Sequence, residues 1–324
     1  MAQPSTTASA AGKQQGQQQG IRQSGQQDVR WEGGDPVFRD DFAGGLDVGT
    51  SESRWQLRPA GALPDGDGIV RASPDGLVVV PTGINAATGE PAFSEASGQG
   101  PGDILRWAVF TTHTASSGVL GFDAPAGQIL TAATRMSARA FGNANAPFGD
   151  SDPDSDMRVG AAALICIDRA SGLILDFVLT NHTTYALYER LGGPDSDHAT
   201  FSYAVDVGRR EPGQSHHLAV ALDVAAGTAR WLLDGTEVLR VDALGHRVLD
   251  PRYLLRSGGG AEQTVRPGQL NVGLAMFASG VWGQGVELTV RHVSMSLSPA
   301  TDEGTERDAT TTSPTSTTDA PGPA

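Results

Sequence analysis

Alternation of apolar and polar residues at every second position is the feature that most constrains this chain. In residues 129–141 one set of alternate positions carries Leu130 and Met136, and the other set carries Arg135 and Arg139. This period of two predicts a β-strand with one apolar and one polar face. Further strands are predicted at residues 159–168, 173–180, 184–191, 201–207, 217–224, 228–233, 236–241, 269–277 and 286–297.

Short turns join most of these segments, and the chain contains 42 glycines to supply them. The dipeptide Asp234-Gly235 between two alternating segments is a strong signal for a β-hairpin. No segment longer than a couple of turns has a helical period. Many strands joined by tight turns, without helices, predict an all-β fold, an antiparallel β-sandwich.

Composition divides the chain into three parts. Residues 1–33 are rich in Gln, Gly and Ser, and residues 300–324 are rich in Thr, Pro and Asp. Neither segment has enough apolar side chains to offset the entropy lost on ordering, so we expect two disordered tails around one folded domain, residues 34–299. The first segment lacks the apolar stretch of a secretory signal, so we expect a cytoplasmic protein.

The charge of the chain excludes several classes of partner. With 23 basic and 37 acidic residues the net charge is −14, which is unfavourable for binding nucleic acid. No apolar run reaches the roughly 18 residues of a membrane span, so no membrane partner is expected. Cys166 is the single cysteine and lies in the apolar segment ALICID, which predicts a buried, unreactive thiol. The oligomeric state is left open.

Three segments follow one another in the order HLAVALDVAAGTARWLLDGTEVLRVD, LNVGLAMFASG and VELTVRHVSMSL. This order resembles the C-terminal half of the concanavalin A-like lectin/glucanase fold. The block DFVLTNHTTYALYERL is similar to an uncharacterised bacterial family of that fold. The resemblance covers roughly residues 38–297 and implies a jelly roll. It implies no single activity, because the fold serves lectins, glycosidases, lyases and adhesion modules.

Glycoside hydrolases of this fold carry acidic residues at alternate positions of one strand, because two carboxyl groups must flank the scissile bond. Here the matching strand, residues 173–180, contains Asp176 as its one carboxylate. The nearest other acids are Asp168, across a turn, and Glu189, on the next strand. Asp176 and Glu189 are therefore the candidate acid and base. The alternative is that Asp176 is structural and pairs with an arginine such as Arg190.

The remaining candidates are ligand contacts. If their strands are neighbours, Arg135 and Arg139 share a polar sheet face with Asp176, Tyr188 and Arg190. A solvated sheet face without function is the alternative reading.

Within residues 184–191, alternation puts Tyr188 and Arg190 on one face and Glu189 on the other. Leucines on either side of Glu189 predict that its face is the more buried. Trp107 and Trp231 alternate with apolar neighbours and are predicted to lie in the core, whereas Trp282, in SGVWGQG, is the candidate for stacking on a ligand.

The loop at residues 150–156 has aspartates at alternate positions, a pattern able to surround a calcium ion. It lacks the glycine and final glutamate of an EF-hand loop, and the histidines form no metal triad. We therefore read it as a solvated acidic loop and predict no metal and no cofactor.

These observations favour a binding function. The chain is predicted to bind a carbohydrate or another small polar ligand on the concave sheet face without hydrolysing it. The alternative is an enzyme on the same face that uses Asp176 or Glu189 as acid or base. Such an enzyme belongs either to the glycoside hydrolases and lyases or to the cyclases and isomerases of specialised metabolism.

Overall fold

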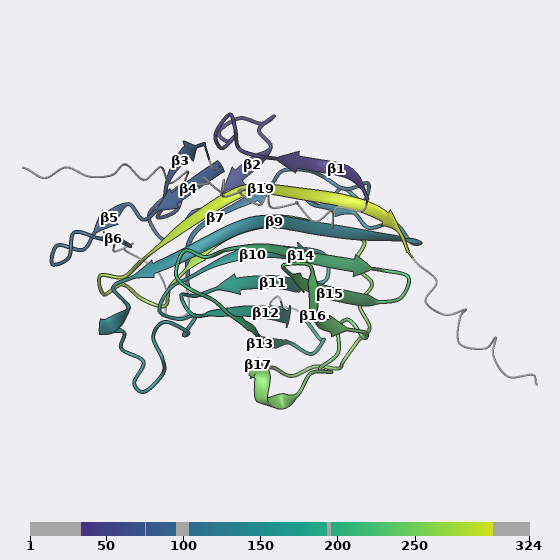
Figure 1. The fold of residues 1–324 in the computed structure, drawn as a ribbon. Coiled ribbons are helices and arrows are strands. Elements are labelled where there is room, and N and C mark those ends of the chain that lie inside the picture. Colours follow the sequence, from purple (N-terminus) through teal and green to yellow (C-terminus); the bar gives the residue numbers. More distant parts are fainter. Residues whose placement is uncertain (1–33, 75, 95–103, 193–195, 301–324) are drawn as a thin grey trace, which may run out of the picture. The chain divides into compact units, whose positions relative to one another are not determined.

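The computed structural model describes residues 34–74, 76–94, 104–192 and 196–300, whose strands form two large antiparallel sheets and one small one (Figure 1). All of these strands belong to one compact unit. The predicted tails, residues 1–33 and 300–324, lie outside the described ranges except for Ala300.

The first large sheet has eight strands. From edge to edge it contains β16 (Thr236–Val241), β15 (Thr228–Leu233), β14 (Ser215–Asp223), β9 (Gln128–Phe141), β19 (Gly285–Pro299), β4 (Gly76–Val80) and β3 (Ile69–Ser73), with β1 (Asp35–Asp40) paired to β19. The two longest strands, β9 and β19, run side by side through its centre (Figure 1).

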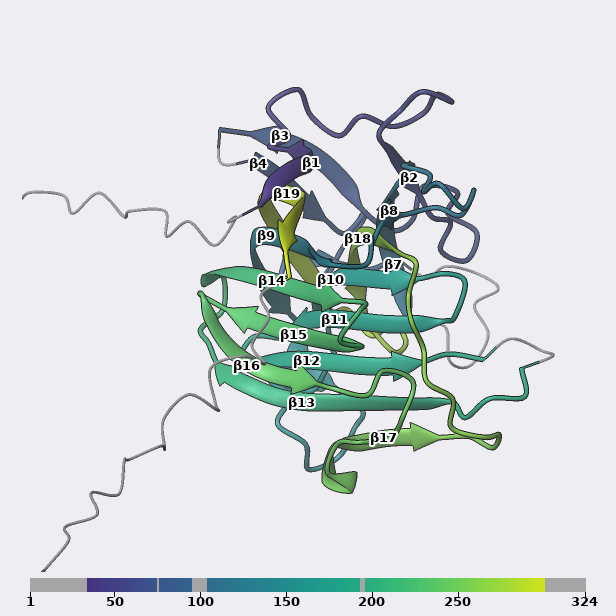
Figure 2. The ribbon, with the colours of Figure 1, turned by 90° about the vertical axis from the view of Figure 1, so that its right-hand side faces the viewer.

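The second large sheet has nine strands. From edge to edge it contains β17 (Leu254–Ser257), β13 (Phe201–Arg209), β12 (Thr183–Arg190), β11 (Leu173–Leu179), β10 (Ala161–Asp168), β18 (Gln269–Phe277), β7 (Leu105–Thr111) and β2 (Trp55–Leu57), with β8 (Phe122–Asp123) paired to β18. Figure 2 shows β10 to β13 in succession, with β17 beyond them at the edge.

The remaining elements are short. A two-stranded sheet joins β5 (Gly83–Ile84) to β6 (Pro91–Ala92), and two 3₁₀ turns, η1 (Asn143–Asn145) and η2 (Pro251–Tyr253), are the helical elements of the described residues. No helix in the described part of the chain has the length and hydropathy needed to cross a bilayer.

The core lies between the two large sheets, where the inward-facing side chains of both meet. Trp107 of the nine-stranded sheet and Trp231 of the eight-stranded sheet are fully buried there, as predicted. A second, smaller apolar cluster, which includes Ile165 and Val178, lies on the other side of the nine-stranded sheet. We call that side the outer face, because it is turned away from the core between the sheets.

The predicted antiparallel β-sandwich of the jelly-roll type is confirmed. All ten predicted strands are present, and three of them, β15, β16 and β18, have the predicted bounds. The hairpin between β15 and β16 turns at Asp234 and Gly235, whose φ angles are 48° and 85°. Both angles are positive, as the tightest hairpin turn requires, and Asp-Gly accepts them readily.

Candidate functional site

Asp176 and Glu189 lie on the outer face of the nine-stranded sheet. Asp176 on β11 is opposite Leu187 on β12, and Glu189 is opposite Ile174, so the two acids are diagonal neighbours. Residues between them along the strands, such as Tyr188, point into the core instead. The register of β11 and β12 therefore brings these two carboxyl groups near each other on adjacent strands.

Asp176 is a buried carboxyl group without a cationic partner in the described part of the chain. Its side chain is 5% exposed, and Oδ1 accepts the backbone N–H of Cys166 at 2.9 Å. Burial, and then the charge of Glu189, raise the pKa of Asp176 well above its ordinary value, while the Cys166 N–H acts in the opposite direction. The group therefore holds its proton more tightly than an exposed aspartate.

The backbone of Asp176 is also engaged from the core side. The indole Nε1–H of Trp231, which belongs to the opposite sheet, donates to the Asp176 carbonyl at 3.0 Å. Asp176 is thus held by the core through its backbone and by β10 through its side chain, which fixes the carboxyl group in place.

Glu189 has a different environment. It is half-buried, and burial raises its pKa, while a hydrogen bond with Ser202 and the charge of Arg256 lower it. Arg256 Nη2 lies 3.9 Å from Glu189 Oε1, and Arg256 Nε donates to Ser202 Oγ at 3.0 Å. These three residues face one another across β12, β13 and β17, and form a row of carboxylate, hydroxyl and guanidinium groups.

A second polar group lies on the same face towards the opposite edge of the sheet. Arg169, in the turn after β10, donates through Nη2 to Asn271 Oδ1 at 3.0 Å, and its guanidinium carbon is 4.8 Å from the ring centroid of Phe110. The ring lies against Gly273, where a Cβ would be 2.5 Å from it. Burial, and then the charge of Arg58, lower the pKa of Arg169.

Arg135 and Arg139 do not join this face. Both lie on β9 in the eight-stranded sheet, on the side opposite Met136 and Ala138, which point into the core. The expectation that they share a face with Asp176 is wrong, because their strand belongs to the other sheet.

Tyr188 and Arg190 also point away from the outer face. Tyr188 is fully buried in the core; its hydroxyl accepts the Gly245 N–H at 2.7 Å and donates to the His246 carbonyl at 3.1 Å. Arg190 is 5% exposed and donates to the Gln263 carbonyl at 2.9 Å.

The prediction that Glu189 lies on the more buried face of β12 is therefore wrong. The polar tips of Tyr188 and Arg190 find carbonyl partners, which makes burial of that face possible. Arg190 also forms no ion pair with Asp176, so the structural alternative for Asp176, pairing with this arginine, is not observed.

Two other sequence predictions concern the loops. Trp282, between β18 and β19, is half-buried and packs edge-on against Phe148 with centroids 5.4 Å apart, so its contact with a ligand stays a prediction.

In the acidic loop, Asp152 and Asp154 approach His182, with potential ligand atoms within 4.8 Å of one another, while Asp156 pairs with Arg158. The four aspartates therefore do not surround one point, and the predicted absence of a metal stays a prediction.

Sequence reasoning missed Arg256, Ser202 and Arg169. Arg256 lies on the four-residue edge strand β17, and its pairing with β13 contains a register shift. A strand so short has no detectable alternation. Ser202 does lie within a predicted strand, residues 201–207, but alternation within one strand does not identify its cross-strand neighbours.

The chain matches one family model over most of its length and one curated protein over part of it. Residues 39–299 match the model of a family described as "Family of unknown function (DUF6081)". The "Uncharacterized protein L829" of Acanthamoeba polyphaga mimivirus is 25% identical over 182 residues; the match covers 39% of this chain and 42% of that protein, less than half its length.

Solved structures with similar chain folds include an endo-1,3-beta-glucanase from Streptomyces sioyaensis, with 16% identity and a TM-score of 0.48 over 83% of this chain and 98% of that chain. The alginate lyase A1-II' has 10% identity and a TM-score of 0.42 over 76% and 95% of the two chains. A Bacillus licheniformis beta-glucanase has 11% identity and a TM-score of 0.39 over 80% and 97%.

Proposed function

Since the chain belongs to the family of unknown function (DUF6081), we propose a function from its own residues: the outer face of the nine-stranded sheet binds a carbohydrate or another small polar ligand without hydrolysing it. The row formed by Glu189, Ser202 and Arg256 carries this proposal. It offers a carboxylate to accept hydrogen bonds and a guanidinium to donate them, as recognition of a hydroxyl-rich ligand requires, while the buried Ser202 hydroxyl links these two groups.

The neighbourhood of this row is suited to the rings of such a ligand. Leu187 and Tyr185 are half-buried on the same side of β12 and supply apolar surface beside the polar groups. Ligand pockets commonly combine a mostly apolar lining with a few polar groups that fix orientation.

Binding without hydrolysis is favoured because β11 has no second acidic residue beside Asp176 on its own face. The positions on either side of Asp176 on its own face are Ile174 and Val178, both aliphatic. A retaining glycosidase needs a nucleophile and an acid about 5–5.5 Å apart, facing the same bond. Asp176, nearly fully buried and bound to the Cys166 N–H, is poorly exposed for the role of nucleophile.

One observation favours acid–base catalysis as the second candidate. Burial raises the pKa of Asp176 well above its ordinary value. Burial also raises the pKa of Glu189, but there a hydrogen bond with Ser202 and the charge of Arg256 act in the opposite direction. Neighbouring carboxyl groups whose environments differ in this way are typical of an acid and base pair. In such an enzyme Asp176 donates the proton and Glu189 accepts one.

Binding and product analysis distinguish the two candidates. Hexasaccharides of β-1,3-glucan and of alginate are titrated calorimetrically into the parent protein, Glu189→Gln and Asp176→Asn, with Glu287→Gln on β19 as the control. We expect Glu189→Gln to weaken binding at least about tenfold, or 1.4 kcal/mol, and Glu287→Gln to leave it unchanged.

Mass spectrometry of the incubated saccharides completes the test. On the binding proposal every saccharide is recovered intact. Cleaved products that disappear in Asp176→Asn establish the enzyme instead. Failure of the parent to bind either saccharide, or parent-like binding by Glu189→Gln, contradicts the proposed site.

A further inference from the structure

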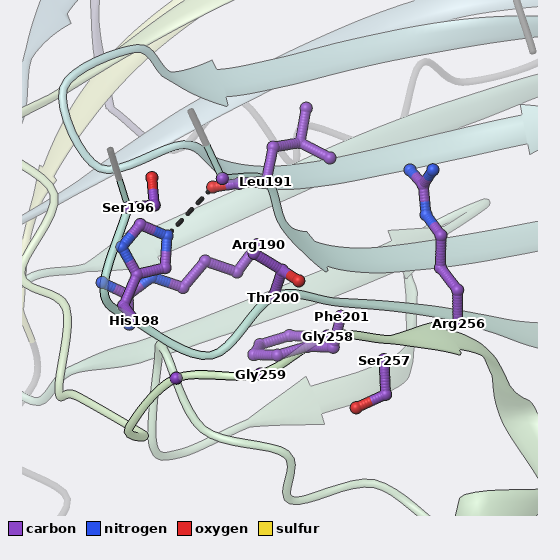
Figure 3. Close-up of a pocket in the computed structure, with 12 residues that line it drawn as sticks. Arg190, Leu191, Ser196, His198, Thr200, Phe201, Arg256, Ser257, Gly258 and Gly259 are labelled. Atoms are coloured by element: carbon purple, nitrogen blue, oxygen red, sulfur yellow. Dashed lines mark hydrogen bonds between the residues drawn. The ribbon is translucent and has the colours of Figure 1, made fainter. Parts of the chain in front are cut away.

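A cavity of about 690 Å³ lies at the edge of the nine-stranded sheet, where the end of β12, the start of β13 and β17 meet (Figure 3). Its volume lies within the range typical of sites for small molecules. Figure 3 shows Ser196 and His198 on one side of the cavity and Arg256 on the other. The proposed function does not involve this cavity, although Arg256 borders both sites.

The charge of the lining contrasts with that of the whole chain. The protein carries 37 acidic and 23 basic residues, yet the described lining contains Arg190, Arg256 and His198 and no aspartate or glutamate. The other polar side chains of the lining are hydroxyls, on Ser196, Thr200 and Ser257. A cavity lined by two arginines, a histidine and hydroxyl groups favours an anionic, polar occupant.

Arg190 is the most constrained of these cations. It is 5% exposed, its Nη1 donates to the Gln263 carbonyl at 2.9 Å, and its buried Nε has no hydrogen-bond partner among the described residues. In the described part of the chain no carboxylate forms an ion pair with it. Burial acts against the charged guanidinium and lowers its pKa, whereas the charge of Asp197, between the lining residues Ser196 and His198, acts on Arg190 from a distance in the opposite direction. An anion bound in the cavity adds a direct partner for this buried guanidinium.

Glycines form the opposite wall and bring bare backbone to the cavity. At Gly258 a Cβ would lie 2.1 Å from Thr200 Oγ1, and at Gly260, where φ is +94°, it would lie 2.3 Å from the carbonyl carbon of His198. Gly260 therefore requires glycine, whereas at Gly258 a side chain is opposed by the Thr200 hydroxyl. At Gly259, which also lines the cavity, a Cβ meets no atom within 4 Å.

His198 is held in an orientation that suits the same ligand. Its Nε2–H donates to the Leu191 carbonyl at 3.1 Å, an interaction that fixes the ring at the cavity wall (Figure 3). Arg256 is the exposed counterpart: its side chain is 71% exposed, its Nε donates to Ser202 Oγ at 3.0 Å, and its Nη2 lies 3.9 Å from Glu189 Oε1, so most of the guanidinium remains accessible to a ligand.

We propose that this cavity binds a small molecule through an anionic group, a phosphate or a carboxylate, held by a lining arginine: Arg190, beside His198, or Arg256, at the other side of the cavity. Guanidinium groups bind both kinds of anion through paired hydrogen bonds. The hydroxyl side chains and the glycine backbone bind the uncharged polar part of the molecule.

The test fills the cavity rather than removing Arg190, whose loss threatens the fold. Gly259→Leu adds a side chain where the structure leaves space, and Gly268→Leu is the matched control, since a Cβ there also meets no atom within 4 Å. The probes are glucose 6-phosphate, glucuronate and inorganic phosphate, with glucose as the neutral reference, titrated calorimetrically in a phosphate-free buffer at low salt.

We expect the parent to bind at least one anionic probe at least about tenfold more tightly than glucose, and added salt to weaken that binding. Preference for glucose 6-phosphate over glucuronate identifies a phosphate site, and the reverse preference identifies a carboxylate site. Gly259→Leu loses this binding at least tenfold, whereas Gly268→Leu and Glu189→Gln retain it, which separates this site from the outer-face row.

Three results overturn the proposal. The first is a parent protein that binds none of the anionic probes. The second is binding of glucose as tight as that of the anions. The third is a Gly259→Leu protein that is folded, as judged by circular dichroism, and binds the anions as the parent does.

Discussion

Substituting asparagine for Asp176 removes an ionisable group while keeping the shape of the protonated carboxyl. The amide oxygen can still accept the Cys166 N–H that Oδ1 accepts at 2.9 Å. The perturbation therefore changes the response of the protein to pH rather than its packing. Its size follows from the raised pKa of Asp176, which has burial as its main cause and the charge of Glu189 as the second.

The direction in which the free energy of unfolding changes with pH depends on whether the folded or the unfolded state binds the Asp176 proton more tightly. Because the pKa of Asp176 is raised in the folded protein, the folded state keeps its proton at pH values where the unfolded chain, with a pKa near 3.8, has lost it. The free energy of unfolding therefore falls as pH rises from about 4 towards the folded pKa, by up to about 1.4 kcal/mol per pH unit. Asp176→Asn lacks this contribution, so its stability relative to the parent increases with pH.

Urea unfolding followed by tryptophan fluorescence at pH 5, 6, 7 and 8 measures this difference. The control is Asp168→Asn, a buried aspartate whose Oδ1 accepts from Ala170 N–H and Gln269 Nε2 and whose Oδ2 accepts from Ser171 Oγ. An amide nitrogen at the Oδ1 position faces two N–H donors, whereas at the Oδ2 position it donates to the Ser171 hydroxyl, which then accepts; we therefore expect a loss of about 1 kcal/mol at pH 7. Stability curves for the parent and Asp176→Asn that run parallel from pH 5 to 8 refute the reasoning.

Three further predictions concern other parts of the molecule. Arg210 is 4% exposed, burial lowers its pKa to about 10, and its guanidinium donates to the carbonyls of Thr180, Ala138 and Gln214. Because Arg210→Leu leaves these carbonyls without donors, we expect it to lower the free energy of unfolding in urea by at least about 3 kcal/mol, and a smaller loss contradicts this role. Burial, and then the charge of Asp176, raise the pKa of the Cys166 thiol, so a thiol reagent should label it only after unfolding, as mass spectrometry at pH 8 checks. Chelator and added calcium should leave the melting temperature unchanged, because the acidic loop does not gather its four aspartates; a calcium-dependent rise disproves this.

Alternation predicts which residues of one strand share a side, and that information was sufficient for the strands. It did not place Asp176 correctly, because the expectation put it on the side of Tyr188 and Arg190, whereas the register of β11 and β12 puts it on the side of Glu189. The two strands are joined by a tight turn, so their register follows from local geometry. Alternation does not reveal which sheet a strand joins. Arg135 and Arg139 have the expected polar side, but β9 pairs with β14 and β19, which follow much later in the chain.

The inward face of β12 shows a second limit of prediction from local sequence patterns. Tyr188 and Arg190 look like solvent-facing residues by composition, but their polar tips reach carbonyl groups of the segment at residues 243–263. Those partners lie more than 50 residues along the chain from β12, so no local pattern indicates them. The cavity lined by Arg190 depends on the same long-range packing and was not predictable for that reason.

The hydrogen bond from Trp231 to the Asp176 carbonyl links the two sheets at the candidate site. Indole emission responds to charges and dipoles close to the ring, and this indole N–H lies 3.0 Å from the backbone oxygen of the residue that carries the buried carboxyl. The protein thus contains an intrinsic optical probe on the core side of the outer face. The fluorescence difference between the parent and Trp231→Phe reports proton loss from Asp176, or arrival of a ligand, in unlabelled protein.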